Sequence, residues 1–224
     1  MTNCVTERIG THKYDDTLAS SPNYVGYMYP ETTDNCVSQQ IVPLTSSKDT
    51  LTTTVNAMTA AGSTAGQIGL AWAWYLIDAN FNSLWPSNTA AAYHAVNTIK
   101  AVILMTDGQF NAQYYNGVIA QDSDNANGNS IAHDSSNGDS TAQALSLCTA
   151  IKATGGPNDN TQLFTVGFDI GDSSTASKAA RTFLNSCATD DPHFYLAVTD
   201  DDGASLTAAF KAIAKNLSNL RLSK

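Results

Sequence analysis

The chain has 224 residues, of which 42% are hydrophobic and 14% are charged, and its formal net charge is −9. The hydrophobic share is sufficient for a folded core and argues against a chain that is disordered throughout. The acidic balance, with only a thin excess of Lys and Arg near the C-terminus, argues against nucleic acid and anionic membrane surfaces as partners.

The first sixty residues have an irregular pattern in which Tyr, Pro, Asn, Asp and Thr dominate. Within them we predict an edge strand at 41–44, because Pro is tolerated at sheet edges, and a short helix over 48–60. A Gly-rich turn at 62–66 leads into residues 67–77, which are apolar on nearly every face. This pattern predicts a buried helix that is too short to cross a bilayer.

Three apolar runs further along predict strands at 101–105, 163–168 and 193–198, and the first two are typical of strands buried on both faces. Residues 111–140 are rich in Asn, Asp, Ser and Gly and predict a long mobile loop. Helices are predicted at 141–154, 174–187 and 203–220. In the last helix we expect one stripe to pack on the sheet: Leu206, Phe210, Ile213, Leu217 and Leu220.

This alternation of helices and strands predicts an α/β fold, with an open and mostly parallel sheet covered by helices on both faces. Connections between its parallel strands are expected to be right-handed.

Four cysteines are present, and none belongs to a C-x-x-C pair, which argues against zinc-ribbon and thioredoxin-like proteins. Their even number and wide spacing favour two disulfides formed in an oxidising compartment. We expect Cys4 to pair with Cys36 and Cys148 with Cys187, because each pair falls in one region of the chain. The alternative is that they are buried free thiols.

Asp107 and Thr64 are the candidate ligand residues. Asp107 directly follows the apolar run 101–105, and ligands of open α/β sheets bind beyond the carboxyl ends of the strands. Asp107-Gly108 is also a common turn sequence. Thr64 lies in the Gly-rich loop before the apolar helix, so its hydroxyl could point to the same edge. A hydroxyl and a carboxylate together suit Mg²⁺ or Mn²⁺.

Residues 60–72 and 102–108, together with several later stretches, resemble TadG-type tight-adherence (Flp/Tad) pilus-assembly proteins, in the C-terminal part of their von Willebrand factor A-like domain. Residues 60–72 match the segment G-x-T-x-x-x-I-G-L-x-W, and residues 102–108 match the strand V-x-L-M-T-D-G. Further matches lie at 147–152, 164–169, 184–188, 194–195 and 209–222, with a weaker match around residues 4–8 and Cys36. The set is specific, whereas any single piece would be weak.

The resemblance implies that residues 61–224 are the C-terminal part of a von Willebrand factor A-like domain that lacks its first central strand, and that residues 1–60 are an irregular, cysteine-containing insertion or edge segment. It also implies a metal-ion-dependent adhesion site, in which Thr64 and Asp107 match two positions. The D-x-S-x-S loop of that site is absent from this sequence and is expected upstream of Met1, together with a membrane anchor.

The function implied is a non-enzymatic binding and scaffolding module of Tad pilus assembly, with pilus-assembly or pilin-like proteins as partners. Its expected location is the bacterial cell envelope, on the periplasmic side of the inner membrane or at the cell surface. Two alternatives stay open: a metal-dependent hydrolase on a similar sheet, and a purely structural fragment. None of His12, His94, His133 and His193 lies in a recognisable catalytic motif.

Overall fold

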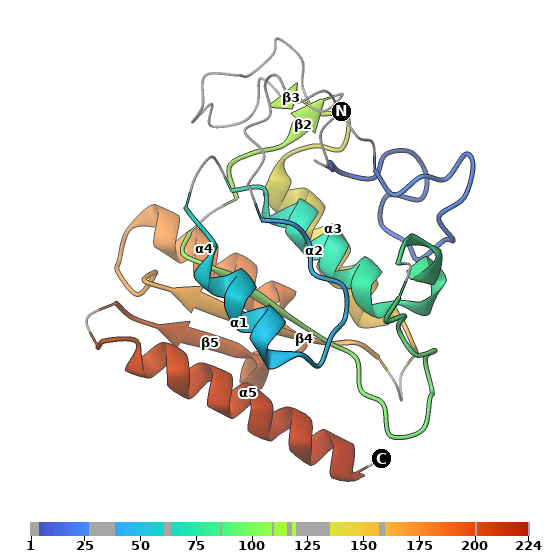
Figure 1. The fold of residues 1–224 in the computed structure, drawn as a ribbon. Helices are drawn as coiled ribbons and strands as arrows, with labels where there is room; N and C mark the ends of the chain where they lie inside the picture. The colour runs from blue at the N-terminus through green and yellow to red at the C-terminus, as the bar shows by residue number, and fades with distance from the viewer. Residues whose placement is uncertain are drawn as a thin grey trace. The chain divides into compact units, whose positions relative to one another are not determined.

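The structure is a computed structural model, shown in Figure 1, that describes most of the chain. The described residues are 5–26, 39–60, 64–85, 87–108, 110–115, 118–119, 135–156, 160–199 and 201–223. Within these ranges, no helix is both long and apolar enough to cross a lipid bilayer.

The chain forms two compact units. The N-terminal unit comprises residues 1–91 and 110–143, and the sheet unit comprises residues 92–109 and 144–224. The predicted boundary near residue 60 stays a prediction.

A parallel sheet forms the centre of the sheet unit. Its strands are β1 (Ala101–Thr106), β4 (Gln162–Phe168) and β5 (Phe194–Ala197), in the order β1-β4-β5. Ala101 lies opposite Gln162, and Thr165 lies opposite Phe194. These strands confirm the predicted apolar runs and the predicted α/β class.

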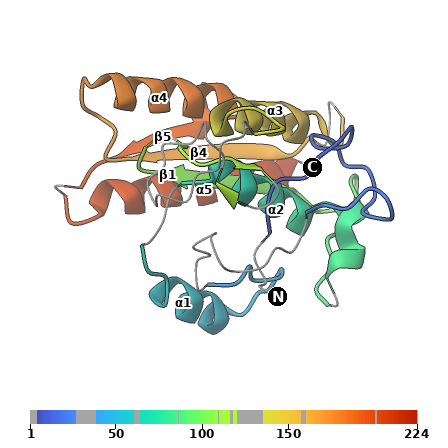
Figure 2. The same ribbon diagram turned by 90° about the horizontal axis from the view of Figure 1, so that it is seen from above.

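Helices cover both faces of this sheet, as predicted. Figure 2 shows α4 (Thr175–Cys187) and the sheet-unit part of α3 (Ser140–Ala153) on one face, and α5 (Ala204–Ser223) on the other. The side chains of β4 alternate between the two faces: Phe164 packs toward α5, whereas the Thr165 hydroxyl donates to the Leu184 carbonyl oxygen in α4 at 3.0 Å. The short helix η2 (Asp191–His193) precedes β5.

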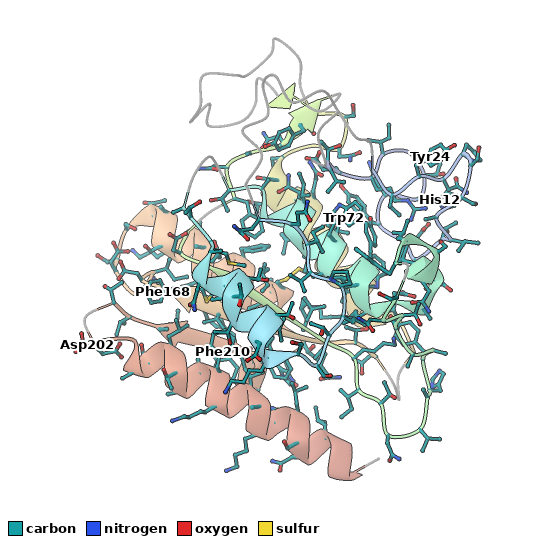
Figure 3. All side chains as sticks on the ribbon, viewed as in Figure 1. His12, Tyr24, Trp72, Phe168, Asp202 and Phe210 are labelled. Atoms are coloured by element: carbon teal, nitrogen blue, oxygen red, sulfur yellow. A yellow bond between two sulfur atoms is a disulfide. The ribbon has the colours of Figure 1, made fainter. Side chains whose placement is uncertain are left out.

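The α5 face differs from the predicted stripe. Leu206, Ala209, Ile213 and Leu217 pack on the sheet, but Phe210, labelled in Figure 3, is 41% exposed. Successive helix residues are about 100° apart, so Ala209 and Phe210 cannot both face the sheet. The predicted stripe is therefore wrong at Phe210, because Ala209, three residues after Leu206, is the residue that faces the sheet.

Strand β1 is less buried than its sequence predicts. Ile103 is 40% exposed and Met105 is 49% exposed, because β1 is an edge strand of the described sheet and α5 packs mainly over β4 and β5. The prediction of a strand buried on both faces is wrong for these two side chains. Alternate residues of a strand share one face, so Ile103 and Met105 lie on the same face as Ala101, and α5 covers that face mainly over β4 and β5.

In the N-terminal unit, aromatic packing surrounds α2 (Gly66–Ile77). Trp74, Tyr75 and Phe81 are fully buried, and the rings of Tyr75 and Phe81 are 4.4 Å apart. Phe81 belongs to the unpredicted 3-10 helix η1 (Ala79–Leu84), and the Trp85 indole N–H donates to the Tyr75 carbonyl oxygen at 2.8 Å. The prediction that 67–77 is a core helix is confirmed.

A buried arginine organises the first irregular segment. Arg8 is 3% exposed and donates to the backbone carbonyl oxygens of Asp15, Thr17 and Asn23. Its guanidinium also lies 5.9 Å from the centroid of the Phe81 ring. Polar residues without regular secondary structure are thus fixed by one cation that satisfies several carbonyl groups.

Other predicted elements of this unit need correction. Helix α1 (Lys48–Asn56) ends earlier than residue 60, and residues 41–44 form no strand, since Pro43 lacks a backbone donor and no ladder forms there. The predicted loop 111–140 contains a short antiparallel pair, β2 (Tyr114–Tyr115) and β3 (Val118–Ile119), and its last residue, Ser140, is the first residue of α3. Residues 116–117 and 120–134 of that loop lie outside the described residues.

Candidate functional site

Asp107 lies at the carboxyl end of β1, where the sequence predicts a ligand position. Its side chain is exposed, and it occupies a tight turn. The Thr106 hydroxyl accepts from the Gly108 N–H at 3.3 Å and donates to the Gly108 carbonyl oxygen at 3.2 Å. Thr106 itself is buried, so the turn is anchored in the sheet while the Asp107 carboxylate stays accessible to a ligand.

Two further residues with side-chain oxygen atoms, Asp169 and Thr199, follow the neighbouring strand ends, and no sequence motif indicated them. Asp169 follows β4, and its N–H donates to the Ala197 carbonyl oxygen at 2.8 Å. The Thr199 hydroxyl, just after β5, donates to Asp169 Oδ1 at 3.1 Å. Since β1, β4 and β5 are adjacent and parallel, the three residues follow neighbouring strand ends at one edge of the sheet. Asp169 adopts a φ of 55°, a value that Asp tolerates better than most residues.

Thr64 is held by its backbone within the N-terminal unit. Its N–H donates to Asn111 Oδ1 at 2.7 Å, and its carbonyl oxygen accepts from the N–H groups of Asn111 at 2.9 Å and Ala112 at 3.2 Å. Helix α2 begins directly afterwards at Gly66, where the Phe110 ring fills the space that a Cβ would need. The loop carrying Thr64 is therefore fastened to residues 110–112.

The structure does not bring the two predicted ligand residues into one described site. Thr64 belongs to the N-terminal unit and Asp107 to the sheet unit, so their convergence stays a prediction. Across the described ranges, no three His, Cys, Asp or Glu side chains form a group that could hold a metal ion. The oxygen chemistry of Thr64 and Asp107 suits Mg²⁺ or Mn²⁺, but these residues alone do not form a complete shell.

Two of the described histidines, His193 and His12, have structural partners. His193 is 6% exposed, its Nδ1 is paired with Asp190 Oδ1, and its ring lies 4.4 Å from that of Phe164. His12 Nδ1 lies 2.8 Å from Asp15 Oδ2. His133 lies outside the described residues.

One predicted disulfide is present. Cys148 in α3 is joined to Cys187 at the end of α4, with a Cα–Cα distance of 5.2 Å, and both residues are buried. Cys4 and Cys36 lie outside the described residues, so their predicted pairing stays a prediction.

No protein-family model and no curated protein matches this chain. Two solved structures of the pilus adhesin SpaC from Lactobacillus rhamnosus GG are similar to it. The open conformation shows 15% identity and a TM-score of 0.48, covering 79% of this chain and 22% of the SpaC chain. The other structure shows 14% identity and a TM-score of 0.45, covering 77% and 21%. This chain thus spans about a fifth of the length of SpaC, and no conclusion about function follows from a similarity of this size.

Proposed function

We propose that this chain is a non-enzymatic binding and scaffolding module of a bacterial Tad pilus assembly and secretion system, built on a von Willebrand factor A-like sheet. The observation that carries the proposal is the position of Asp107, exposed and held in a tight turn at the carboxyl end of a parallel strand. Ligands of open α/β sheets bind at such an edge. The distributed TadG-type sequence motifs around Thr64 and Asp107 support the same assignment.

The binding chemistry we propose is partial coordination of Mg²⁺ or Mn²⁺ by Thr64 and Asp107. Both ions prefer oxygen ligands and keep several exchangeable positions. The missing ligands would come from outside the described residues, with an acidic group of a pilus-assembly or pilin-like partner among them. Binding would then depend on the metal and on the partner's carboxylate together.

The proposed location is the cell envelope, on the periplasmic side of the inner membrane or at the cell surface. The Cys148–Cys187 disulfide supports this, because disulfides persist in oxidising compartments. Because they are held in a buried disulfide, these two cysteines cannot supply a nucleophilic thiolate.

Thermal unfolding with EDTA, and then with excess Mg²⁺ or Mn²⁺, tests the metal site. A ligand that binds only the folded protein stabilises it by about 2.7 kcal/mol at a hundred times its Kd. We expect the unfolding midpoint to rise with metal in the wild type and to stay unchanged in Asp107→Asn.

Asp49→Asn is the matched control, because it removes an exposed carboxylate of the N-terminal unit and should leave the metal response intact. A wild-type midpoint that ignores both metals would contradict the proposed site. An equal loss of response in both variants would show that the metal effect is non-specific.

A further inference from the structure

A buried carboxyl group, that of Glu7, lies in the N-terminal unit. Glu7 is 7% exposed, and its partner Gln67, in the first turn of α2, is 1% exposed. Gln67 Nε2 donates to Glu7 Oε1 at 3.0 Å, and the N–H of Tyr114 donates to the same oxygen at 3.1 Å. The carboxyl group therefore connects the N-terminal segment to both α2 and β2.

The Gln67 amide is only half satisfied. Its two N–H donors are both used, since Nε2 also donates to the Ala112 carbonyl oxygen at 2.8 Å. Its Oε1 is fully buried and accepts no hydrogen bond from any described residue. Leaving a buried acceptor without a donor costs free energy, so a donor is needed at this position.

The surroundings of Glu7 oppose a negative charge. Burial raises the pKa of Glu7, although hydrogen bonds from Gln67, Tyr114 and Gln143 act in the opposite direction. Tyr14 is close enough that burial, together with the charges of Glu7 and Asp139, raises its pKa to about 12.

The neighbouring cation is engaged elsewhere. The Arg8 guanidinium donates to the backbone carbonyl oxygens of Asp15, Thr17 and Asn23, and it lies 3.8 Å from the Asp15 carboxylate. The groups that act on Glu7 are thus the amide side chains of Gln67 in α2 and Gln143 in α3 and the backbone N–H of Tyr114 in β2, and the nearby Tyr14 is itself an acid. This set suits a neutral carboxylic acid.

We propose that Glu7 and Gln67 form a neutral acid–amide pair that acts as a proton-operated latch on the loop carrying Thr64. In this pair the protonated carboxyl group of Glu7 donates to Gln67 Oε1 while Glu7 Oε1 accepts from Gln67 Nε2. A planar acid and a planar amide can exchange two such bonds side by side. The missing donor for Gln67 is then the carboxyl proton.

The pair is connected to the Thr64 loop by short steps. Gln67 lies three residues after Thr64, and Ala112 links the two, because its carbonyl oxygen accepts from Gln67 while its N–H donates to the Thr64 carbonyl oxygen. Ionisation of Glu7 removes one donor and sets a carboxylate against Gln67 Oε1, which loosens this connection. The functional consequence rests on the proposed role of Thr64, whereas the acid–amide pair itself does not.

The sign of the pH dependence follows from the raised pKa. Protonation of Glu7 stabilises the folded N-terminal unit. This stabilisation is fully present below the pKa of Glu7 in the unfolded chain, near the ordinary value of 4.5, and it is lost as pH rises through the higher pKa of Glu7 in the folded protein.

Carbon-13 NMR can measure this titration directly. The chain contains only two glutamates, Glu7 and Glu31, so labelling Glu at Cδ yields two signals, and Glu7→Gln identifies one of them by its loss. We expect the Glu7 signal to titrate above 4.5. A midpoint at or below 4.5 overturns the proposal.

Glu7→Gln supplies an independent measurement, because an amide at position 7 can accept from Tyr114 and donate to Gln67 Oε1 without ionising. We expect its unfolding midpoint to match that of the wild type at about pH 4 and to exceed it at about pH 8. Asp49→Asn, the exposed control, should follow the wild type at both values. If Glu7→Gln is the less stable protein at about pH 8, the carboxylate is the native form and the latch is wrong.

Neither measurement uses metal, so the outcome is separate from that of the Asp107→Asn experiment. Hydrogen exchange then tests the link to the loop. In the wild type, the Thr64 amide should exchange faster once Glu7 has ionised, after correction for the intrinsic pH dependence of exchange. In Glu7→Gln, the corrected exchange rate should not change with pH. Equal exchange in the two proteins would overturn the latch even if the pair exists.

Discussion

Cys148 in α3 and Cys187, the last residue of α4, are joined by a buried disulfide on one face of the sheet. Lys152, one helical turn after Cys148, reinforces the same junction. Its Nζ donates to the carbonyl oxygens of Ser186 and Ala188, each at 2.9 Å. The end of α4 is therefore fixed to α3 by one covalent bond and two hydrogen bonds.

Replacing both Cys148 and Cys187 by Ala should destabilise the protein. The bond closes a loop with a sequence separation of 39 residues, for which loop-closure entropy predicts a loss of about 4 kcal/mol. Urea unfolding followed by circular dichroism measures the change. The double variant is used because a single replacement would leave an unpaired thiol in the core. Lys152→Met should cost much less, and an unchanged unfolding midpoint in the double variant would show that packing alone holds the two helices together.

Asn111→Ala should loosen the loop that carries Thr64. The substitution removes the side-chain acceptor of the Thr64 N–H, and an unsatisfied donor in a partly buried position costs about 1–2 kcal/mol. We expect faster hydrogen exchange at the Thr64 amide and a smaller metal response, because the Thr64 hydroxyl would no longer be held in place.

Asn82→Ala is the matched control for that variant. Asn82 holds a different loop of the same unit, since its Oδ1 accepts from the Ala90 N–H at 2.8 Å. It should cost a similar amount of stability without changing exchange at Thr64. Faster Thr64 exchange in both variants would mean that general destabilisation, and not the Asn111 contact, controls the loop.

Gly167→Ala should disturb the packing between β4 and α4. A Cβ at this position would lie 2.5 Å from Ile170 Cδ1 and 3.1 Å from Leu184 Cδ1, and such overpacking costs about 1–3 kcal/mol. Gly171→Ala is the control, because a Cβ there meets no atom within 4 Å and should change stability by less than about 0.5 kcal/mol. Thermal unfolding of both variants measures the difference, and equal midpoints would show that the core around Gly167 repacks freely.

Local sequence pattern determined much of the secondary structure. The apolar runs at 101–105 and 163–168, each bounded by polar residues, are parallel strands, and the helices predicted at 141–154 and 174–187 begin and end within one residue of their observed bounds. These elements are dictated by burial and by capping, as with Ser174, whose side chain accepts from the Ser177 N–H at the start of α4. The alternation of strands and helices was then sufficient to predict a parallel sheet covered on both faces.

Only the tertiary structure decided features that depend on distant residues. Ile103 and Met105 are partly exposed because β1 is an edge strand, which an apolar run cannot indicate by itself. The buried carboxyl group of Glu7 is held by Gln67 and Tyr114, which lie at least sixty residues away along the chain, and no local pattern distinguishes a buried carboxyl group from an exposed one. The sequence by itself therefore determined which segments form strands and helices and where Asp107 falls on its strand, because these depend on near neighbours. The partners and burial of each side chain follow from long-range packing, which only the folded chain defines.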